Sequence, residues 1–313
     1  MLKVFVLLLA SLGSAAELGA QEMLIFDRAP SSSSNQVLGV KKVDSFLADD
    51  FELGAVKEDW VIDHIRLWAV ADPKAESAHG LGELFRKISL LGGIAPDVPL
   101  PVGDCDCHNL PALKEAAIKQ GSDAADSRDV EISAGAAVEG SPSWQIDFRD
   151  LKWSVPGGTR IQFGVLAEPR AGYSWYDLAT PAEPGEHLRV FSSAGKFEET
   201  FAAPAPARIN VQVWGHLLAR ISIRAEGPKL RVILWEAPFL DPNQIDHASL
   251  RFGPRGAAPE SARVEDAGQT GKPALVMLFQ PSASGIAPKS VNACLSGKRA
   301  DGAPFEACDL VPH

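Results

Sequence analysis

The chain has 313 residues, a hydrophobic fraction of 46% and a formal net charge of −10 at pH 7. The composition is that of a globular protein and excludes wholesale disorder and a polytopic membrane protein. The negative charge repels phosphate backbones, and no basic run exceeds the pair Lys41 and Lys42, so nucleic acid is excluded as an expected partner. The length favours two domains, each able to bury its own core.

The first twenty residues have the layout of a secretory signal peptide. Lys3 gives a basic start, Val4 to Leu9 form an apolar run, and small residues follow at Ser14 to Ala16 and at Gly19 and Ala20. The apolar run is far shorter than the roughly 20 residues of a membrane-spanning helix. We therefore expect residues 1–20 to be removed, the mature chain to have no membrane span, and the protein to be secreted or periplasmic.

A Pro- and Asp-rich insertion covers roughly residues 95–128. Within it, Leu110 to Gln120 is rich in Ala, Lys, Glu and Leu, has Pro111 near its start and is followed by Gly121. These start and stop signals predict a short helix. We expect the insertion to be a surface excursion from a sheet edge.

The insertion also contains the string Asp104-Cys105-Asp106-Cys107-His108, which invites a metal-site interpretation. Structural zinc sites usually separate their cysteines by two or more residues and take a second pair from elsewhere. Cys105, Cys107 and His108 are therefore only weak candidates for metal ligands. A strained local disulfide between Cys105 and Cys107, a crosslink to another chain, free thiols and an exchange among all four cysteines all stay open.

Short stretches of alternating apolar and polar residues follow, and this period of two predicts half-buried strands. The parity shifts after Phe148, which predicts a bulge or tight turn near Arg149 and Asp150. The string from Val155 to Gly158 supplies turn chemistry before the next strand. The alternation is clearest at Trp144, Ile146 and Phe148; at Ile161, Phe163 and Val165; and at Ile209, Val211 and Val213.

An Ala- and Pro-rich string from Ala202 to Ala207 resembles an interdomain linker, although a strand follows it. Keeping that strand with the first domain divides the mature chain into residues 21–216 and 217–313. We predict an all-β protein of two tandem β-sandwich domains, with the short helical insertion in the first.

Two cysteines near the end of the second domain, Cys294 and Cys308, flank a turn-forming segment from Gly297 to Pro304. An exported protein meets an oxidising environment, in which such pairs become disulfides. We expect a Cys294–Cys308 disulfide, and closing a loop of this length stabilises by roughly 3 kcal/mol in the chain-entropy model.

Parts of the first domain resemble a group of uncharacterised secreted bacterial β-sandwich proteins. The matching strings are ADDFEL at Ala48 to Leu53, WQIDFRDLKWSVPGGTRIQFGV at residues 144–165 and INVQVWG at Ile209 to Gly215. The resemblance implies a sandwich fold and no particular reaction.

The second domain, from about Leu218, resembles a C-terminal module found on many exported bacterial proteins. The resemblance covers VILW at Val232 to Trp235 and residues 239–259, 264–279, 284–286 and 294–309. In that family the loop after the string ED commonly carries an oxygen-ligand series that suits Ca²⁺.

The calcium-type loop is degenerate in this chain. Asp266 and Gly271 remain, but Gly268 and Thr270 stand where the family has intermediate oxygen ligands. Because Ca²⁺ takes six to eight oxygen ligands, we expect no Ca²⁺ and no other cofactor, and Asp266 is a weak metal candidate.

Recognisable catalytic motifs are absent from the sequence. The chain has no Gly-x-Ser-x-Gly elbow, phosphate loop or dinucleotide fingerprint. Acidic residues at Glu52, Glu58, Asp59 and Asp63, and at Asp147 and Asp150, would suit a glycoside hydrolase only if the fold paired two of them across a cleft. A non-enzymatic protein is the favoured interpretation, and a carbohydrate-active enzyme or its accessory module is the alternative.

Seven tryptophans against two tyrosines hint at a ligand surface, because sugar rings stack on exposed indoles. Trp60, Trp144 and Trp153 are in phase with apolar neighbours, which predicts burial. Trp214 falls on the polar parity of its strand and Trp175 lies in the loop-like string GYSWYD. We predict an exported binding or structural protein of the bacterial envelope or exterior, with a polysaccharide or another envelope protein as partner. The candidate aromatic platform is Tyr173, Trp175, Tyr176 and Trp214.

Overall fold

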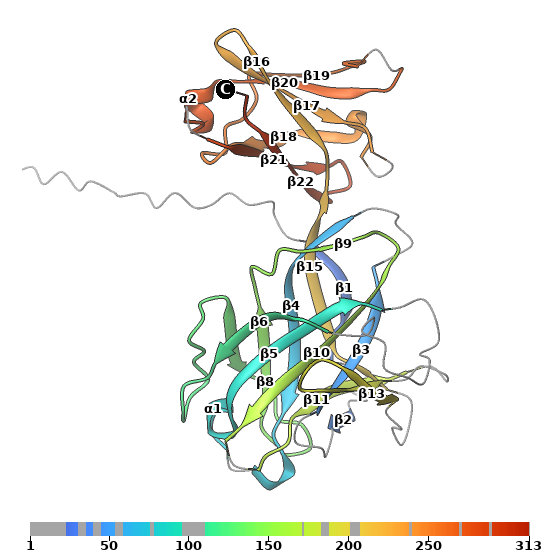
Figure 1. Ribbon diagram of the computed structural model, residues 1–313, viewed down its shortest axis with the longest axis vertical. Helices are drawn as coiled ribbons and strands as arrows, with labels where there is room; N and C mark the ends of the chain where they lie inside the picture. The colour runs from blue at the N-terminus through green and yellow to red at the C-terminus, as the bar shows by residue number, and fades with distance from the viewer. Residues whose placement is uncertain are drawn as a thin grey trace, which may run out of the picture. The chain divides into compact units, whose positions relative to one another are not determined.

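The computed structural model describes residues 23–30, 36–39, 45–53, 59–75, 78–95, 110–170, 172–182, 188–200, 207–237, 240–268, 271–287 and 290–312. The predicted signal segment and the string with Cys105, Cys107 and His108 lie outside these residues. Strands dominate the described chain and the helices are single turns, so the all-β prediction is confirmed. The chain divides into two compact units, one of which is Glu22–Leu218 while the other contains Ala219–His313 (Figure 1).

The unit Glu22–Leu218 contains two sheets. In the first, which we call the β4 sheet, antiparallel neighbours run β1 (Met23–Arg28), β15 (Val211–Leu218), β4 (Trp60–Val70), β8 (Ser143–Phe148) and β7 (Val130–Ala134). Strand β9 (Trp153–Val155) also pairs with β4. Strand β11 (Tyr176–Pro181) pairs with β4, β2 (Gln36–Gly39) and β14 (Ala207–Ile209).

The second sheet, which we call the β10 sheet, is six-stranded. Its order is β13 (Phe197–Thr200), β12 (Arg189–Ser192), β3 (Ser45–Glu52), β10 (Arg160–Pro169), β5 (Phe85–Ile94) and β6 (Ala112–Ala117). Two short turns, η1 (Pro73–Ala75) and α1 (Leu81–Leu84), precede β5.

The inner faces of these two sheets supply one hydrophobic core. All nine apolar side chains that alternate in the three predicted strands belong to it, as in Phe148 and Phe163, which are 0% exposed. Each such side chain contributes roughly 1.5–3 kcal/mol when it leaves water. The apolar–polar alternation therefore identified these core residues correctly. Trp144 is buried as predicted, whereas Trp60 and Trp153 are half-buried and pack against the core.

The predicted irregularity after Phe148 is present. Strand β8 ends at Phe148 and β9 begins at Trp153, and both pair with β4. Between them Asp150 and Lys152 have φ of 50° and 51°, in the left-handed region that side chains rarely adopt. The predicted turn also forms, with Gly158 at φ +67° before β10.

The helix predicted for Leu110 to Gln120 is wrong, because this segment forms strand β6. It pairs with β5 from Lys87 opposite Ala117 to Leu91 opposite Ala112. Lys87 Nζ lies 2.9 Å from Glu115 Oε1, and Ala116 is buried in the core. A helix of this length is marginal without tertiary support, so pairing with an open sheet edge outweighs the local helix propensity.

The second unit contains a four-stranded sheet in the order β16 (Ile221–Glu226), β17 (Lys229–Trp235), β20 (Ala274–Phe279) and β19 (Ser261–Glu265). Strand β21 (Asn292–Arg299) pairs with β22 (Pro304–Leu310) and with β18 (Ile245–Phe252). Phe252 and Phe279 bring β18 against β20, with ring centroids 4.7 Å apart. The helical turns η3 (Pro242–Gln244) and α2 (Pro281–Ser284) complete the unit. The arrangement of the two units as tandem sandwiches stays a prediction.

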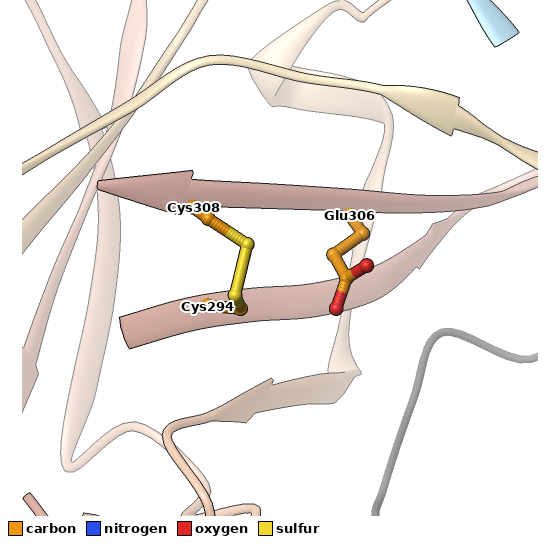
Figure 2. Close-up of side chains that lie close together, drawn as sticks. All are labelled: Cys294, Glu306 and Cys308. Atoms are coloured by element: carbon orange, nitrogen blue, oxygen red, sulfur yellow. A yellow bond between two sulfur atoms is a disulfide. The ribbon is translucent and has the colours of Figure 1, made fainter. Parts of the chain in front are cut away.

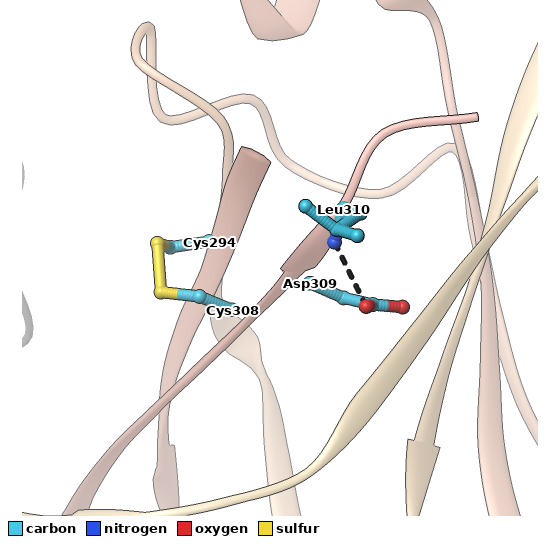
Figure 3. Close-up of a disulfide and its surroundings, with 4 residues drawn as sticks. All are labelled: Cys294, Cys308, Asp309 and Leu310. Carbon is cyan, nitrogen blue, oxygen red and sulfur yellow. Dashed lines mark hydrogen bonds between the residues drawn. A yellow bond between two sulfur atoms is a disulfide. The ribbon is translucent and has the colours of Figure 1, made fainter. Parts of the chain in front are cut away.

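The disulfide between Cys294 and Cys308 is confirmed, and it joins directly opposite residues of β21 and β22 (Figure 3). Gly302, with φ +89°, lies in the turn that links these strands. No helix within the described parts of the chain is long and apolar enough to cross a membrane.

Candidate ligand-binding face

Five of the seven tryptophans pack in a hydrophobic core, and two do not. Trp144 lies in the core of the unit Glu22–Leu218, and Trp60, Trp153 and Trp175 pack against that core, while Trp235 packs against a core cluster of the other unit. Trp68 and Trp214 are half-buried and are not among the side chains packed against that core. They lie on the outer face of the β4 sheet, because their neighbours in sequence face inward.

Trp68 was not among the predicted ligand residues. It alternates along β4 with Leu67 and Ala69, which are 1% exposed in the core, and shares parity with His64 and Arg66. This alternation is visible in the sequence and could have identified Trp68 as a residue of the outer face.

A row of polar side chains crosses the outer face of the β4 sheet. The register places Asp27 opposite Gln212, Gln212 opposite Arg66, Arg66 opposite Asp147, and Asp147 opposite Glu131. We call these five residues the polar row. Directly opposite residues in a sheet share a face, so the row runs from β1 to β7 across the strands between them.

Trp214 lies beside the polar row and contacts two side chains of β4. Its ring stacks on the His64 imidazole with centroids 4.2 Å apart and an interplanar angle of 10°. The Arg66 guanidinium carbon is 5.0 Å from the Trp214 ring centroid, within the range of a cation–π contact. The indole is therefore held in a fixed orientation while part of its surface meets solvent.

Asp147 fixes the groups that support Trp214. One carboxylate oxygen lies 2.5 Å from His64 Nε2 and accepts a 2.8 Å hydrogen bond from Arg66 Nε; the other accepts a 3.0 Å bond from Gln145 Nε2. Burial raises the pKa of Asp147, but the hydrogen bonds from His64, Arg66 and Gln145 outweigh it and bring the pKa to about 2. Asp147 is therefore ionised at neutral pH.

The other predicted platform residues are not brought together with Trp214. Trp175 packs against the inner core, where its ring meets Phe85 at 5.3 Å and its Nε1 donates a 2.8 Å hydrogen bond to Asp177. Tyr173 packs against the same core. Tyr176 lies on β11 opposite Gly39, where a Cβ on that glycine would approach the tyrosine ring to 2.5 Å.

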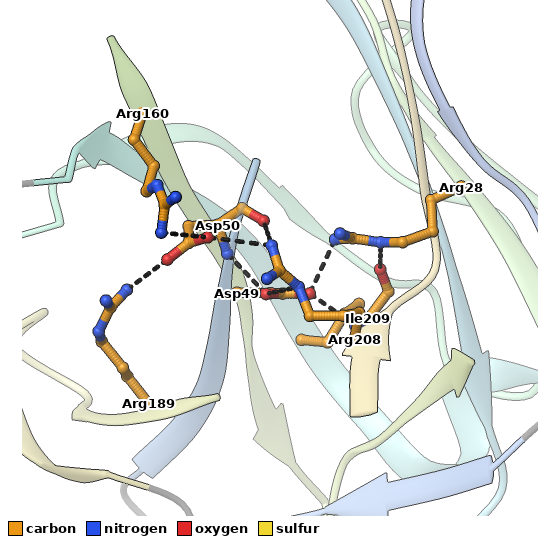
Figure 4. Close-up of polar contacts among 7 residues, drawn as sticks. All are labelled: Arg28, Asp49, Asp50, Arg160, Arg189, Arg208 and Ile209. Atoms are coloured by element: carbon orange, nitrogen blue, oxygen red, sulfur yellow. Dashed lines mark hydrogen bonds and ion pairs between the residues drawn. The ribbon is translucent and has the colours of Figure 1, made fainter. Parts of the chain in front are cut away.

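A second charged cluster lies at β3 and involves both sheets (Figure 4). Asp49, 1% exposed, is 2.7 Å from Arg28 Nη2 and accepts a 2.7 Å bond from the Ile209 amide. Burial raises the pKa of Asp49 although nearby arginines lower it. These contacts join β3 to the β4 sheet, and removing one partner from such a buried pair is costly. The remaining members are Asp50, Arg160, Arg189 and Arg208.

Carboxyl groups with a raised pKa lie in the interior. Burial raises the pKa of Asp177 to about 7, the Trp175 hydrogen bond lowers it and Asp49 raises it further. Asp49 and Asp177 are at most 2% exposed, so a substrate does not reach them. On the outer face Asp147 is held ionised, which is unsuited to a general acid at neutral pH. The hydrolase alternative therefore gains no support from these residues.

Of the weak metal candidates predicted from the sequence, Asp266 lies among the described residues, and it is engaged in another contact. Asp266 accepts a 2.8 Å hydrogen bond from the Gly271 amide. Cys294, Cys308 and Glu306 place ligand atoms within 4.8 Å of one another (Figure 2). Both sulfur atoms form the disulfide, and a metal site needs thiolates.

Comparisons with known proteins give little. No protein-family model matches the chain, and no curated protein does. One similar solved structure contains the cysteine protease and lectin-like domains of a surface layer associated protein of Clostridium difficile, with 11% identity and a TM-score of 0.31; the match covers 60% of this chain and 37% of that one. A marsupial T cell receptor matches with 8% identity and a TM-score of 0.20, over 88% of this chain and 100% of that one. Likenesses this weak carry no functional argument.

Proposed function

We propose that this protein is an exported, non-enzymatic glycan-binding protein of the bacterial envelope or exterior, and that it binds through the outer face of the β4 sheet. One observation carries the proposal: Trp214 lies stacked on His64 beside the polar row. A sugar offers an apolar ring face and a rim of hydroxyls. An ordered indole beside planar polar side chains matches both parts of that chemistry.

Export is supported by two features of different kinds. The first twenty residues have the layout of a signal peptide. The Cys294–Cys308 disulfide belongs to the chemistry of oxidising compartments. A glycan ligand outside the cell membrane agrees with both.

The charge state of Asp147 supports a binding role over catalysis. Asp147 lies opposite Arg66, two residues along β4 from the partner of Trp214, and its low pKa keeps it ionised. Asp63, next to His64 on β4, is held 2.6 Å from His216 Nδ1. Asp147 orients His64 and Arg66 through hydrogen bonds. These contacts hold the polar side chains of the outer face in one arrangement, which suits binding, and they engage the carboxylates with histidine and arginine side chains.

Affinity electrophoresis tests the proposal. The mature protein is run in native gels containing hydroxyethylcellulose, laminarin, mannan or polygalacturonate. We expect at least one neutral polymer to retard the wild type. The Trp214→Ala variant should migrate in that gel as it does in a gel without polymer. Trp175→Phe is the matched control, because Trp175 faces the inner core and the variant keeps an aromatic ring there. Retardation unchanged by Trp214→Ala would contradict the proposed face.

A further inference from the structure

We infer that the ligand is a linear, neutral glycan that contacts both Trp214 and Trp68, so that Trp68 forms a second stacking platform on the same face. This inference rests on the proposed function. The inference adds a second aromatic contact to the site around Trp214. It also specifies the minimum length of the glycan and its lack of charge.

The separation of the two indoles sets the minimum length. Trp214 lies opposite His64, and Trp68 is four residues further along β4 on the same face. At about 3.3 Å per residue, the two positions are roughly 13 Å apart along the strand. A single sugar ring is too small to contact both, whereas a short linear oligosaccharide is long enough.

The groups between the two indoles suit hydroxyls along such a chain. Arg66 lies midway between His64 and Trp68, bonded through Nε to Asp147, and its side chain is 25% exposed. Gln145 lies opposite Trp68, and Ser133 lies opposite Gln145. A chain along β4 would therefore meet Trp214, then the polar row at Arg66, then Trp68 with its polar neighbours.

The charge of the face selects against acidic polymers. Arg66 pairs with Asp147, and Arg149 Nη2 lies 3.3 Å from Glu131 in the polar row. Asp27 accepts a 3.0 Å hydrogen bond from Gln212, a neutral partner. Among these residues there are three carboxylates and two guanidinium groups. The whole chain carries a formal charge of −10. An anionic polymer is repelled by this field, while a neutral one is not.

The test uses oligosaccharides of increasing length, prepared from whichever neutral polymer retards the wild type, with affinity measured by calorimetry. Three proteins are compared: the wild type, Trp68→Ala and Trp68→Phe. For the longer oligomers we expect Trp68→Ala to lose about tenfold in affinity, the order of one lost aromatic contact, and Trp68→Phe to retain most of it. For the disaccharide we expect no change. Polygalacturonate is expected to retard none of the proteins.

Four results would overturn the inference. Equal affinities of the wild type and Trp68→Ala at every length remove the second platform while leaving the proposed function in place. An equal loss at every length, including the disaccharide, assigns Trp68 a structural role. Retardation of the wild type by polygalacturonate alone excludes the neutral class. If no polymer retards the wild type, the proposed function itself fails and this inference with it. Near-ultraviolet circular dichroism confirms that each variant is folded.

Discussion

Asp147 links the stability of the first unit to pH, and the effect can be worked out from its contacts. Its carboxylate is 2% exposed and bonded to His64, Arg66 and Gln145, which bring the pKa from 3.8 to about 2. Because the folded-state pKa lies below the ordinary value, the stabilisation is fully present above about pH 5 and is lost as the pH falls toward 2. A shift of nearly two pH units corresponds to about 2 kcal/mol.

The variant Asp147→Asn removes the charge and keeps the shape. We expect it to lower the free energy of unfolding at pH 7 by about 2 kcal/mol, and to differ less from the wild type at pH 3 than at pH 7. Urea unfolding followed by tryptophan fluorescence measures this, since Trp235 is the one tryptophan of the seven outside the unit Glu22–Leu218. The control is Asp150→Asn, whose side chain is 49% exposed beside Lys152 and contributes little through its screened charge. A constant difference between Asp147→Asn and the wild type from pH 7 to pH 3 would show that ionisation of Asp147 does not stabilise the fold.

Three further variants test other parts of the structure. Asp177→Asn should gain stability relative to the wild type as the pH rises from 4 to 8, because a folded-state pKa of about 7 makes the wild type lose stability over that range; urea unfolding at both pH values that gives no such gain would count against a buried, ionising Asp177. Phe148→Ala should cost about 3–5 kcal/mol by urea unfolding, because Phe148 is 0% exposed in the core; a loss below 1 kcal/mol would contradict its burial. Cys294→Ser with Cys308→Ser should lower the stability of the second unit by roughly 3 kcal/mol for a loop of 14 residues, measured by calorimetry with reduced wild type as reference; equal stability of the oxidised wild type and the variant would argue against this contribution.

The strands with strict alternation were predictable because one face of each packs on a core. Phe148 and Phe163 lie where the period of two places them, and the parity shift after Phe148 coincides with the gap between β8 and β9. The disulfide was predictable because both cysteines flank a turn signal in a short segment. These inferences need only residues that are neighbours in sequence.

The polar network at Trp214 was not predictable, because register brings its members together. His64 and Asp147 are 83 residues apart in sequence and meet because β4 pairs with β8. Asp49 and Asp50 are both buried in β3, where a sequence reading expects acidic residues to be solvated. Strand β6 was missed for the same reason, since its helical composition is overridden by pairing with β5.

Ligand binding by Trp214 and Trp68 can be followed through their indole N–H signals in a nitrogen–proton correlation spectrum. The seven signals are assigned with single Trp→Phe variants, and a neutral oligosaccharide from the retarding polymer is then added. If both indoles contact the glycan, the signals of Trp68 and Trp214 shift with saturation, while those of Trp144 and Trp175 stay in place. Shifts at Trp175 with none at Trp214 would contradict the proposed ligand-binding face.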